Sequence, residues 1–332
     1  MSAPVGATAT VPPMEVIEWL LDSDPALRWQ VRRDLTGATE TELAAERSRV
    51  ATEGWGARLL ALQGEDGQWA GGAHFPAEFD WSTLHRDEDG RLVGQPWTST
   101  SWSLTLLRLF GLDPESQQAR TAVAGVREGC VWEHEGQRFF DGEVEPCING
   151  MTVANGSYFG EDVSSIVDRL LGEQMEDGGW NCEQENGSTR GSFHTTISVL
   201  EGLLEFEEAN GPSPATSEAR GRGEEYLLER RMLRRLSTGE VIDPWFTQFA
   251  FPYWWRYDVL RGLDYLRRAG VPPQERTEEA MRIVVRNRSS DGRWPRQRFD
   301  RGATHFDIDA PEGEPSRWNT FRALRVLDWA AG

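Results

Sequence analysis

Hydrophobic and polar positions along the chain define two kinds of helical segment. In the first kind, apolar or small residues surround nearly the whole predicted helix; these segments are residues 99–107, 192–203, 252–263 and 316–327. In the second kind, such as residues 40–49 and 217–235, charged residues cover much of the surface. A helix that is apolar all round is buried, whereas an amphipathic helix lies at the surface. The alternation of the two kinds predicts an all-α fold with inner and outer helices.

Three helical segments end in one shared motif, which finishes at Trp69, Trp180 and Trp294. Each copy contains an apolar helix end, an Asp-Gly pair and the tryptophan. The glycine supplies the positive-φ position at which a helix stops. We expect each tryptophan to pack back over the helix that it follows.

The spacing of these tryptophans indicates a repeat. They are 111 and 114 residues apart, which is twice a period of roughly 55 residues. Each gap therefore needs a degenerate copy, for which residues 126–140 and 226–239 are candidates. Residues 16–35 form one more predicted hairpin, which brings the total to about six helix pairs. We therefore predict a closed (α/α)6 toroid, with an open helical solenoid as the alternative.

The predicted toroid occupies residues 14–332 as a single domain. Residues 1–13 are small, Pro-containing and uncharged in their side chains, and we expect a disordered leader there. Residues 71–96 lack helical periodicity and are rich in Gly, Asp and His. We interpret them as an insertion over one end of the toroid, either a lid or a surface decoration.

Composition narrows the classes of partner. Hydrophobic residues make up 38% of the 332 residues and charged residues 27%, as is ordinary for a globular protein. The net charge of −19 would repel nucleic acid and anionic membranes, and it favours a cationic or metal-bound ligand. A run of about 18 apolar residues is lacking, so no transmembrane segment is expected. Three cysteines are too few and too odd in number for a disulfide framework, and we expect a cytoplasmic protein.

Residues 63–69 and 174–180 share the pattern Gln-x-x-Asp-Gly-x-Trp, which resembles the QW motifs of squalene-hopene cyclases and their relatives. Residues 178–203 contain a Gly-Gly turn, a polar loop and a His-Thr helix in that order. They are similar to the zinc-site region of protein prenyltransferase β subunits. The chain also resembles short bacterial proteins described as squalene cyclase-like. The likeness covers roughly residues 14–330 and implies the α/α toroid with QW-like repeats, whereas the reaction must be argued from the site.

One expectation from this resemblance concerns cyclisation. Class II terpene cyclases protonate their substrate with an Asp-x-Asp-Asp motif. The nearest match here, residues 307–310, reads Asp-Ile-Asp-Ala and lacks the final aspartate. The chain is also much shorter than a cyclase built from two barrels. Polyene cyclisation by that mechanism is therefore not expected.

A second expectation concerns zinc. Protein prenyltransferases hold zinc with an Asp-x-Cys at the start of one inner helix and a histidine at the start of the next. Cys147 and His194 match two of these positions, and Glu145 replaces the aspartate. A thiolate, an imidazole and a carboxylate suit zinc. The resemblance therefore implies zinc held by Glu145, Cys147 and His194, with Cys182 as a further candidate ligand.

Structural interpretations of these residues remain open, because cysteine is often a small buried hydrophobic residue and histidine a satisfied core residue. Residues 141–145, just before Cys147, carry only acidic charges where prenyltransferases place basic ones. A diphosphate would be repelled there unless Mg²⁺ bridged it. Prenyl transfer from a diphosphate is therefore not expected.

Further candidates lie near the same predicted end of the toroid. Glu183 and Arg190, on a polar loop, and Asn149, in an otherwise apolar helix, are candidate catalytic residues. The candidate substrate-binding residues are Asn186, Trp97, Trp102, Trp254, Trp255 and Trp318. Aromatic faces can bind isoprenoid chains or cations. The alternatives are a solvated loop and tryptophans that only fill the interior.

Two hypotheses about function follow. The leading one is a zinc-dependent transferase, lyase or cyclase-like enzyme that acts on a hydrophobic, isoprenoid-like or cationic small molecule in the central cavity. The alternative is a non-catalytic module that sequesters a ligand or binds a protein on the same toroid. The sequence names neither the substrate nor the oligomeric state.

Overall fold

Helices dominate the regular structure of the residues that the computed structural model describes, which are residues 13–88, 92–298 and 302–332. The α-helices in chain order are α1 (Met14–Leu21), α2 (Pro25–Leu35), α3 (Glu40–Ser48), α4 (Gly54–Leu60), α5 (Thr100–Phe110), α6 (Gln117–Gly129), α7 (Pro146–Tyr158), α8 (Ser164–Gly172), α9 (Phe193–Asn210), α10 (Pro214–Glu229), α11 (Val259–Arg268), α12 (Glu278–Arg286) and α13 (Arg317–Ala331). The mostly helical fold predicted from the sequence is confirmed. Of the predicted leader, residues 1–12 lie outside the described residues.

The strands are short and form two antiparallel pairs. They are β1 (His85–Arg86) with β2 (Leu92–Val93), and β3 (Trp294–Pro295) with β4 (Pro315–Ser316). Short 3₁₀ helices cover Arg49–Ala51, Trp81–Thr83, Phe139–Asp141, Cys182–Gln184, Pro244–Thr247 and Glu275–Thr277. Within the described residues, neither strand pair extends into a closed sheet.

Burial separates the helices into the two kinds that the hydrophobic pattern predicts. Nine of the eleven residues of α5 and ten of the thirteen residues of α7 are buried. By contrast, only four of thirteen are buried in α6 and three of nine in α8. The buried set is α2, α5, α7, α9, α11 and α13. These helices lie inside because side chains on nearly every face need contacts with protein.

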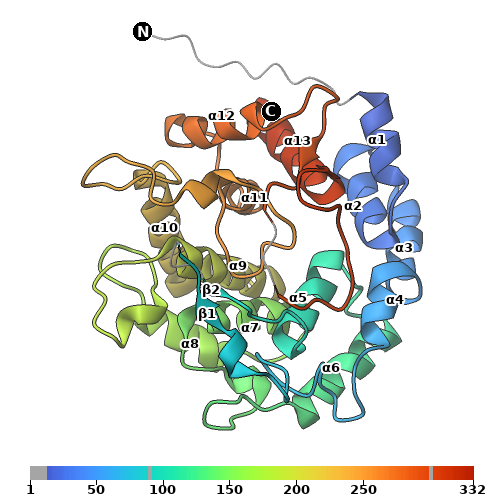
Figure 1. The fold of residues 1–332 in the computed structure, drawn as a ribbon, viewed down its shortest axis with the longest axis vertical. Coiled ribbons are helices and arrows are strands. Elements are labelled where there is room, and N and C mark those ends of the chain that lie inside the picture. The colour runs from blue at the N-terminus through green and yellow to red at the C-terminus, as the bar shows by residue number, and fades with distance from the viewer. Residues whose placement is uncertain (1–12, 89–91, 299–301) are drawn as a thin grey trace.

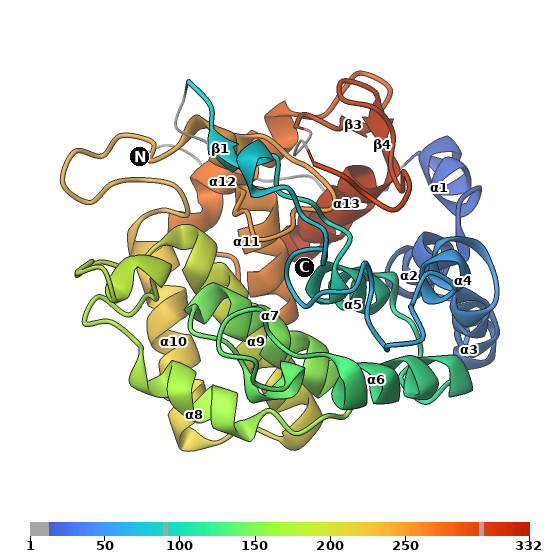
Figure 2. The ribbon, with the colours of Figure 1, turned by 60° about the horizontal axis from the view of Figure 1, so that its bottom comes forward.

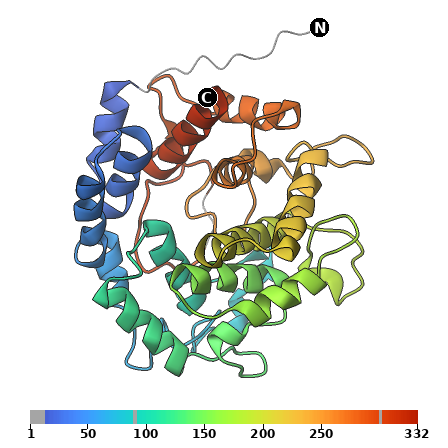
Figure 3. The same cartoon turned by 180° about the vertical axis from the view of Figure 1, so that it is seen from behind.

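The helices follow one another around the molecule (Figure 1; Figure 3 from behind). Several buried helices pack against the more exposed helix that comes next in sequence: α2 against α3, α7 against α8, α9 against α10 and α11 against α12. Neighbouring buried helices also touch, as α5 does α7 and α7 does α9. The last helix, α13, packs against α2 near the start of the chain. Among the described residues, no helix combines the length and apolar composition that a membrane crossing requires.

The repeated tryptophan motif has one geometry in all three copies. Each indole is fully buried, and its N–H donates at 2.7–2.8 Å to the backbone carbonyl ten residues earlier. The tryptophan backbone N–H donates at 3.0–3.2 Å to a threonine hydroxyl in the next buried helix. The sets are Trp69 with Leu59 and Thr100, Trp180 with Leu170 and Thr196, and Trp294 with Val284 and Thr320. Each tryptophan therefore fastens the end of an outer helix to the helix inside it.

The glutamine of the motif joins neighbouring outer helices. The Gln63 side-chain amide donates to the carbonyl oxygen of Ala122 in α6, and Gln174 does the same to Ala219 in α10, both at 2.8 Å. The motif glycine Gly178 has a φ of 85°, and an added Cβ would lie 2.5 Å from the Arg222 carbonyl oxygen. Only glycine fits this close approach of two backbones.

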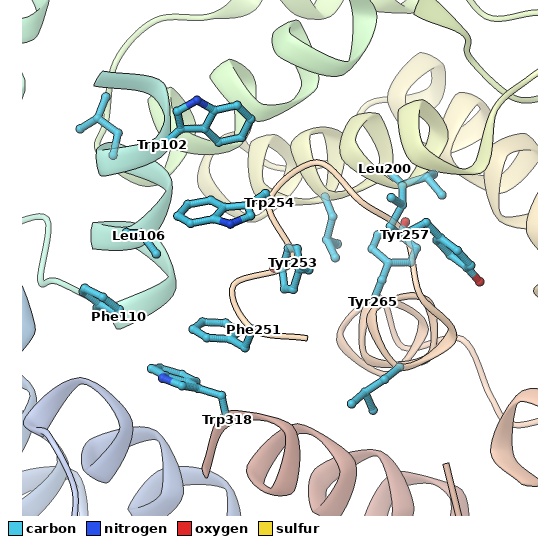
Figure 4. Packing of buried hydrophobic residues seen from close by; sticks show 14 of the residues in the cluster. Trp102, Leu106, Phe110, Leu200, Phe251, Tyr253, Trp254, Tyr257, Tyr265 and Trp318 are labelled. Carbon is cyan, nitrogen blue, oxygen red and sulfur yellow. The ribbon is translucent and has the colours of Figure 1, made fainter. Parts of the chain in front are cut away.

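The insertion and a central loop complete the fold. Residues 71–88 and 92–96 of the insertion contain β1 and β2, and β1 lies on the same side of the molecule as β3 and β4 (Figure 2). The loop before α11 enters the middle of the molecule, where Phe251, Tyr253 and Trp254 lie among the buried helices (Figure 4). Phe251 stacks on Trp318 with ring centroids 4.1 Å apart, and Trp254 lies beside Trp102 with centroids 5.7 Å apart. This loop thus brings aromatic side chains to the centre.

Candidate functional site

The first turns of α5, α7 and α9 and the loop before α11 surround a cavity of about 560 Å³. Side chains of the insertion, including Phe75 and Trp81, line the same cavity. We call it the thiol cavity, because Cys147 and Cys182 both line it. The cavity lies where N-terminal helix ends meet, so residues distant in sequence converge there.

Three acidic groups form a cluster in the wall of the thiol cavity. Glu145 is the residue just before α7, and Pro146 occupies the first helical position, which its fixed φ favours. Cys147 follows in the first turn, and Cys182 comes from the short 3₁₀ helix in the loop between α8 and α9. Ligand atoms of Glu145, Cys147 and Cys182 all lie within 4.8 Å of one another. The fold therefore groups two thiols and a carboxylate.

Contacts inside the cluster are close. The two sulfur atoms are 2.8 Å apart, nearer than the roughly 3.5–4 Å of ordinary non-bonded contacts. The Cys147 thiol also donates to Glu145 Oε2 at 3.5 Å, and the Cys182 sulfur lies 3.4 Å from the Thr195 hydroxyl. This separation lies between the roughly 2.05 Å of a disulfide bond and the roughly 3.8 Å between two thiolates on one tetrahedral zinc ion.

The protonation of the cluster depends on its surroundings. Burial of the carboxyl group raises the pKa of Glu145, although hydrogen bonds from the two thiols oppose the rise. Contact with the Cys182 thiol, followed by burial, raises the pKa of Cys147 well above its usual value. Without a counterion Glu145 and Cys147 therefore resist ionisation. A thiophilic divalent cation would reverse this preference, because metal ligands bind in their deprotonated forms.

His194 lies outside this cluster, although the sequence predicts it as a zinc ligand. Its ring lines the thiol cavity, and its Nδ1 accepts the backbone N–H of Tyr257 at 2.8 Å. Burial, together with the charges of Arg256, Arg298 and Arg261, lowers the pKa of His194 to about 3. The ring is therefore neutral, with its proton on Nε2, and has no free lone pair for a metal. Cys182, which the sequence analysis names as a further candidate ligand, joins the cluster, whereas His194 does not.

The tautomer of His194 can be tested directly. We expect ¹⁵N NMR to show a neutral ring with Nε2 protonated from pH 8 down to about pH 4.5, with no titration near the ordinary value of 6.5. Because the folded pKa is below the unfolded one, the unfolded chain binds the extra proton. Stability conferred by a neutral His194 is therefore lost as the pH falls below 6.5. In His194→Gln, the free energy of unfolding in urea should depend less on pH below 6.5 than it does in the wild type. An imidazolium signal from the wild type at pH 6 would contradict the assignment.

The predicted aromatic residues divide into two groups. Trp102, Trp254 and Trp255 line the thiol cavity. Trp97 does not line it but stacks flat behind Trp254, with centroids 4.9 Å apart and planes 6° apart. Trp318 is 2% exposed and packs in the core, where its indole N–H donates to the Ile308 carbonyl. The structure therefore brings three of the five tryptophans to the cavity.

The predicted polar residues also separate. Glu183 lines the cavity and accepts from the Asn186 side-chain amide at 2.8 Å. Asn186 and Arg190 are exposed and do not line it, because the loop folds back and Asn181 donates to the Arg190 carbonyl. Asn149 is fully buried. Its side-chain amide donates to the Glu143 carbonyl at 2.6 Å and accepts from the Glu143 backbone N–H at 2.7 Å. Asn149 thus positions the loop before α7, and its side chain does not line the cavity.

The floor of the cavity contains charged residues that the sequence interpretation missed. Arg261 donates two hydrogen bonds to the Glu201 carboxylate, at 2.8 and 2.7 Å, and its guanidinium lies 4.2 Å from the Tyr253 ring centroid. Arg108 also lines the floor and lies 3.5 Å from Glu205. The available signal was a charge among apolar residues, as with Arg108, the one charged residue of α5, because an unpaired charge is costly to bury.

No model of a known protein family matches the chain, and a comparison with curated proteins finds no significant relative. Function must therefore be argued from the cavity and the groups that line it.

Proposed function

We propose that the chain is a single (α/α)6 toroid of the kind shared by terpene cyclases and protein prenyltransferase β subunits. The thiol cavity is then its active site. Three features support the closed toroid: six buried helices alternate with more exposed ones, α13 packs against α2, and the tryptophan motif has one geometry in three places. The site lies at the end of the toroid where the inner helices begin.

The proposed activity is that of a metal-dependent enzyme, and the cluster of Glu145, Cys147 and Cys182 carries the proposal. Two thiols and a carboxylate within 4.8 Å form a donor set that suits zinc and leaves a position open. A bound zinc ion would supply Lewis acidity or an activated water. The neutral His194 would donate a hydrogen bond from Nε2 to an oxygen of the substrate.

The lining of the thiol cavity favours an apolar or cationic substrate. Aromatic rings form one wall, where π faces attract cations and apolar chains alike. Carboxylates of Glu133, Glu143, Glu145 and Glu183 lie around the same cavity. Their combined charge disfavours a free diphosphate. We therefore place the substrate among hydrophobic small molecules, including isoprenoid-like ones and amines.

Metal content tests the proposal. Protein purified without chelator is expected to contain about one zinc per chain by elemental mass spectrometry, and Cys147→Ser/Cys182→Ser should contain almost none, because thiolates dominate the affinity. Cobalt substitution should give a thiolate-to-metal absorption band that the double variant lacks.

Cys130→Ala is the matched control, since Cys130 is a buried thiol that does not line the cavity. This variant should keep its zinc. Wild-type protein without zinc, or a Cys147–Cys182 disulfide in freshly purified protein, would rule out the metal site. A metal-bound protein that retains a co-purified small molecule unchanged through repeated incubation would favour a binding module over an enzyme.

A further inference from the structure

A second cavity, of about 760 Å³, lies at the opposite ends of the same inner helices. Leu109 and Gly111 at the end of α5, Tyr158 at the end of α7 and Arg268 at the end of α11 all line it. The thiol cavity, by contrast, is lined by the first turns of α5, α7 and α9. We call the second one the arginine cavity. The two cavities thus open from opposite ends of one helix bundle.

The arginine cavity has an excess of positive charge. Among the described residues that line it are eight arginines against six carboxylates, which leaves two uncompensated positive charges. The chain as a whole has a net charge of −19. A concave site whose sign opposes that of the whole molecule focuses potential on anions and raises their local concentration.

Most of these arginines are committed to protein groups. Arg268 pairs with Glu205 and Glu208, and Arg325 pairs with Asp264 and Asp34. These paired side chains form a polar wall, and the carboxylates already neutralise their charges.

Arg322 is different, because it is buried in the cavity wall without an ionic partner. It is 2% exposed and lines the arginine cavity from α13. Its Nη1 donates to the Ala250 carbonyl at 3.2 Å, but Nε and Nη2 find no partner among the described residues. Burial of a charged group whose donors are unsatisfied is strongly unfavourable unless a counter-charge arrives. Three N–H groups on these two buried nitrogens therefore lack an acceptor.

Two positively charged side chains lie near each other beside Tyr253. Its ring has two guanidinium groups near it, Arg261 at 4.2 Å and Arg322 at 4.9 Å from the centroid. Arg261 is neutralised by Glu201, whereas no carboxylate of the described residues lies within 4.0 Å of Arg322. Burial raises the pKa of Asp258, and the charge of Arg322 opposes this rise. The Arg322 nitrogens and the Asp258 oxygens are nevertheless too far apart for an ion pair, which requires 4.0 Å or less. The positive charge of Arg322 thus lies buried in the wall of the arginine cavity, without an ion-pair partner among the described residues.

Arg47 supplies a second cation on the side of α3. It is half-buried and lines the same cavity, with its Nε bonded to the Gly111 carbonyl and its Nη2 to the Tyr158 hydroxyl. No carboxylate of the described residues pairs with it within 4.0 Å. Neutral partners hold the guanidinium in place while its charge stays uncompensated, as in sites that bind oxyanions.

We infer that the arginine cavity binds a small multivalent oxyanion, either a phosphate monoester or a polycarboxylate, with Arg322 and Arg47 as its principal cationic contacts. A tetrahedral phosphate or a carboxylate accepts N–H groups of a guanidinium in fork geometry. The surrounding carboxylates limit the ligand to one that presents its charge to the unpaired arginines. This site is separate from the proposed metal centre and does not depend on it.

Isothermal titration calorimetry with inorganic phosphate and with succinate, at constant ionic strength in chloride, tests the inference. We expect one molecule of at least one probe to bind per chain. Because a charge-assisted hydrogen bond contributes about 1.5–3 kcal/mol, Arg322→Met and Arg47→Met should each weaken binding about tenfold or more. The preferred probe distinguishes a phosphate ligand from a carboxylate one.

Controls separate this site from general electrostatics and from the metal centre. Arg282→Met removes the same charge from the exposed face of α12 and should leave affinity unchanged. Binding should persist in Cys147→Ser/Cys182→Ser, so a failed metal site and a failed anion site give different results. If Arg322→Met does not fold, Arg47→Met decides alone. The inference is overturned if neither probe binds the wild type, or if Arg282→Met weakens binding as much as Arg47→Met.

Discussion

Trp180→Ala is expected to destabilise the protein by about 3–5 kcal/mol, the usual range for removing a buried tryptophan. The ring is fully buried, and its N–H satisfies the Leu170 carbonyl at the end of α8. Alanine would leave a cavity and an unpaired carbonyl where α8 meets α9. Urea unfolding followed by circular dichroism measures the loss directly.

Trp81→Ala is the matched control for this prediction. Trp81 is 59% exposed in the insertion, so its removal should lower the unfolding free energy by less than about 1 kcal/mol. Equal effects of the two substitutions would mean that the tryptophan motif does not join the helices as described.

Arg261→Met is expected to cost about 3–5 kcal/mol, because it leaves the Glu201 carboxylate without its partner in a largely buried position. Arg261 is 3% exposed and holds Glu201 with two hydrogen bonds, and it also donates to the Arg256 carbonyl at 2.8 Å. The free energy of unfolding in urea should fall accordingly.

The double variant Arg261→Met/Glu201→Leu separates charge from packing. Replacing both members of a buried pair with apolar residues is often nearly neutral, so the double variant should recover most of the lost stability. If the double variant is as unstable as Arg261→Met alone, the lost stability comes from packing and not from the unpaired Glu201 carboxylate.

Regular features of the fold were predictable from the sequence because they depend on local patterns. Each of the motifs that end at Trp69, Trp180 and Trp294 combines a helix end, a turn and a tryptophan within one short segment, so the motif can be recognised in the sequence alone. The threonine that accepts from each tryptophan backbone N–H lies on the next buried helix, 16 to 31 residues further on. That pairing becomes visible only once the helices are packed.

The candidate site was less accessible to sequence reasoning, as His194 and Cys182 illustrate. Sequence position places His194 where a ligand is expected, but its tautomer depends on a backbone N–H contributed by Tyr257, 63 residues away. Cys182 joins Cys147 only because the loop between α8 and α9 folds back over the start of α7. Arg322 gave no signal at all, because a single arginine in a helix reveals neither its burial nor its lack of a partner.

The ion pair between Arg261 and Glu201 lies between the two cavities. Arg261, Glu201, Arg108 and Tyr253 line both cavities, so one layer of side chains separates an acidic compartment from a basic one. A molecule in the thiol cavity therefore meets side chains of the insertion, and an anion in the other cavity meets those of Arg47 and Arg322. Opposite charges are thereby kept in separate compartments along one axis.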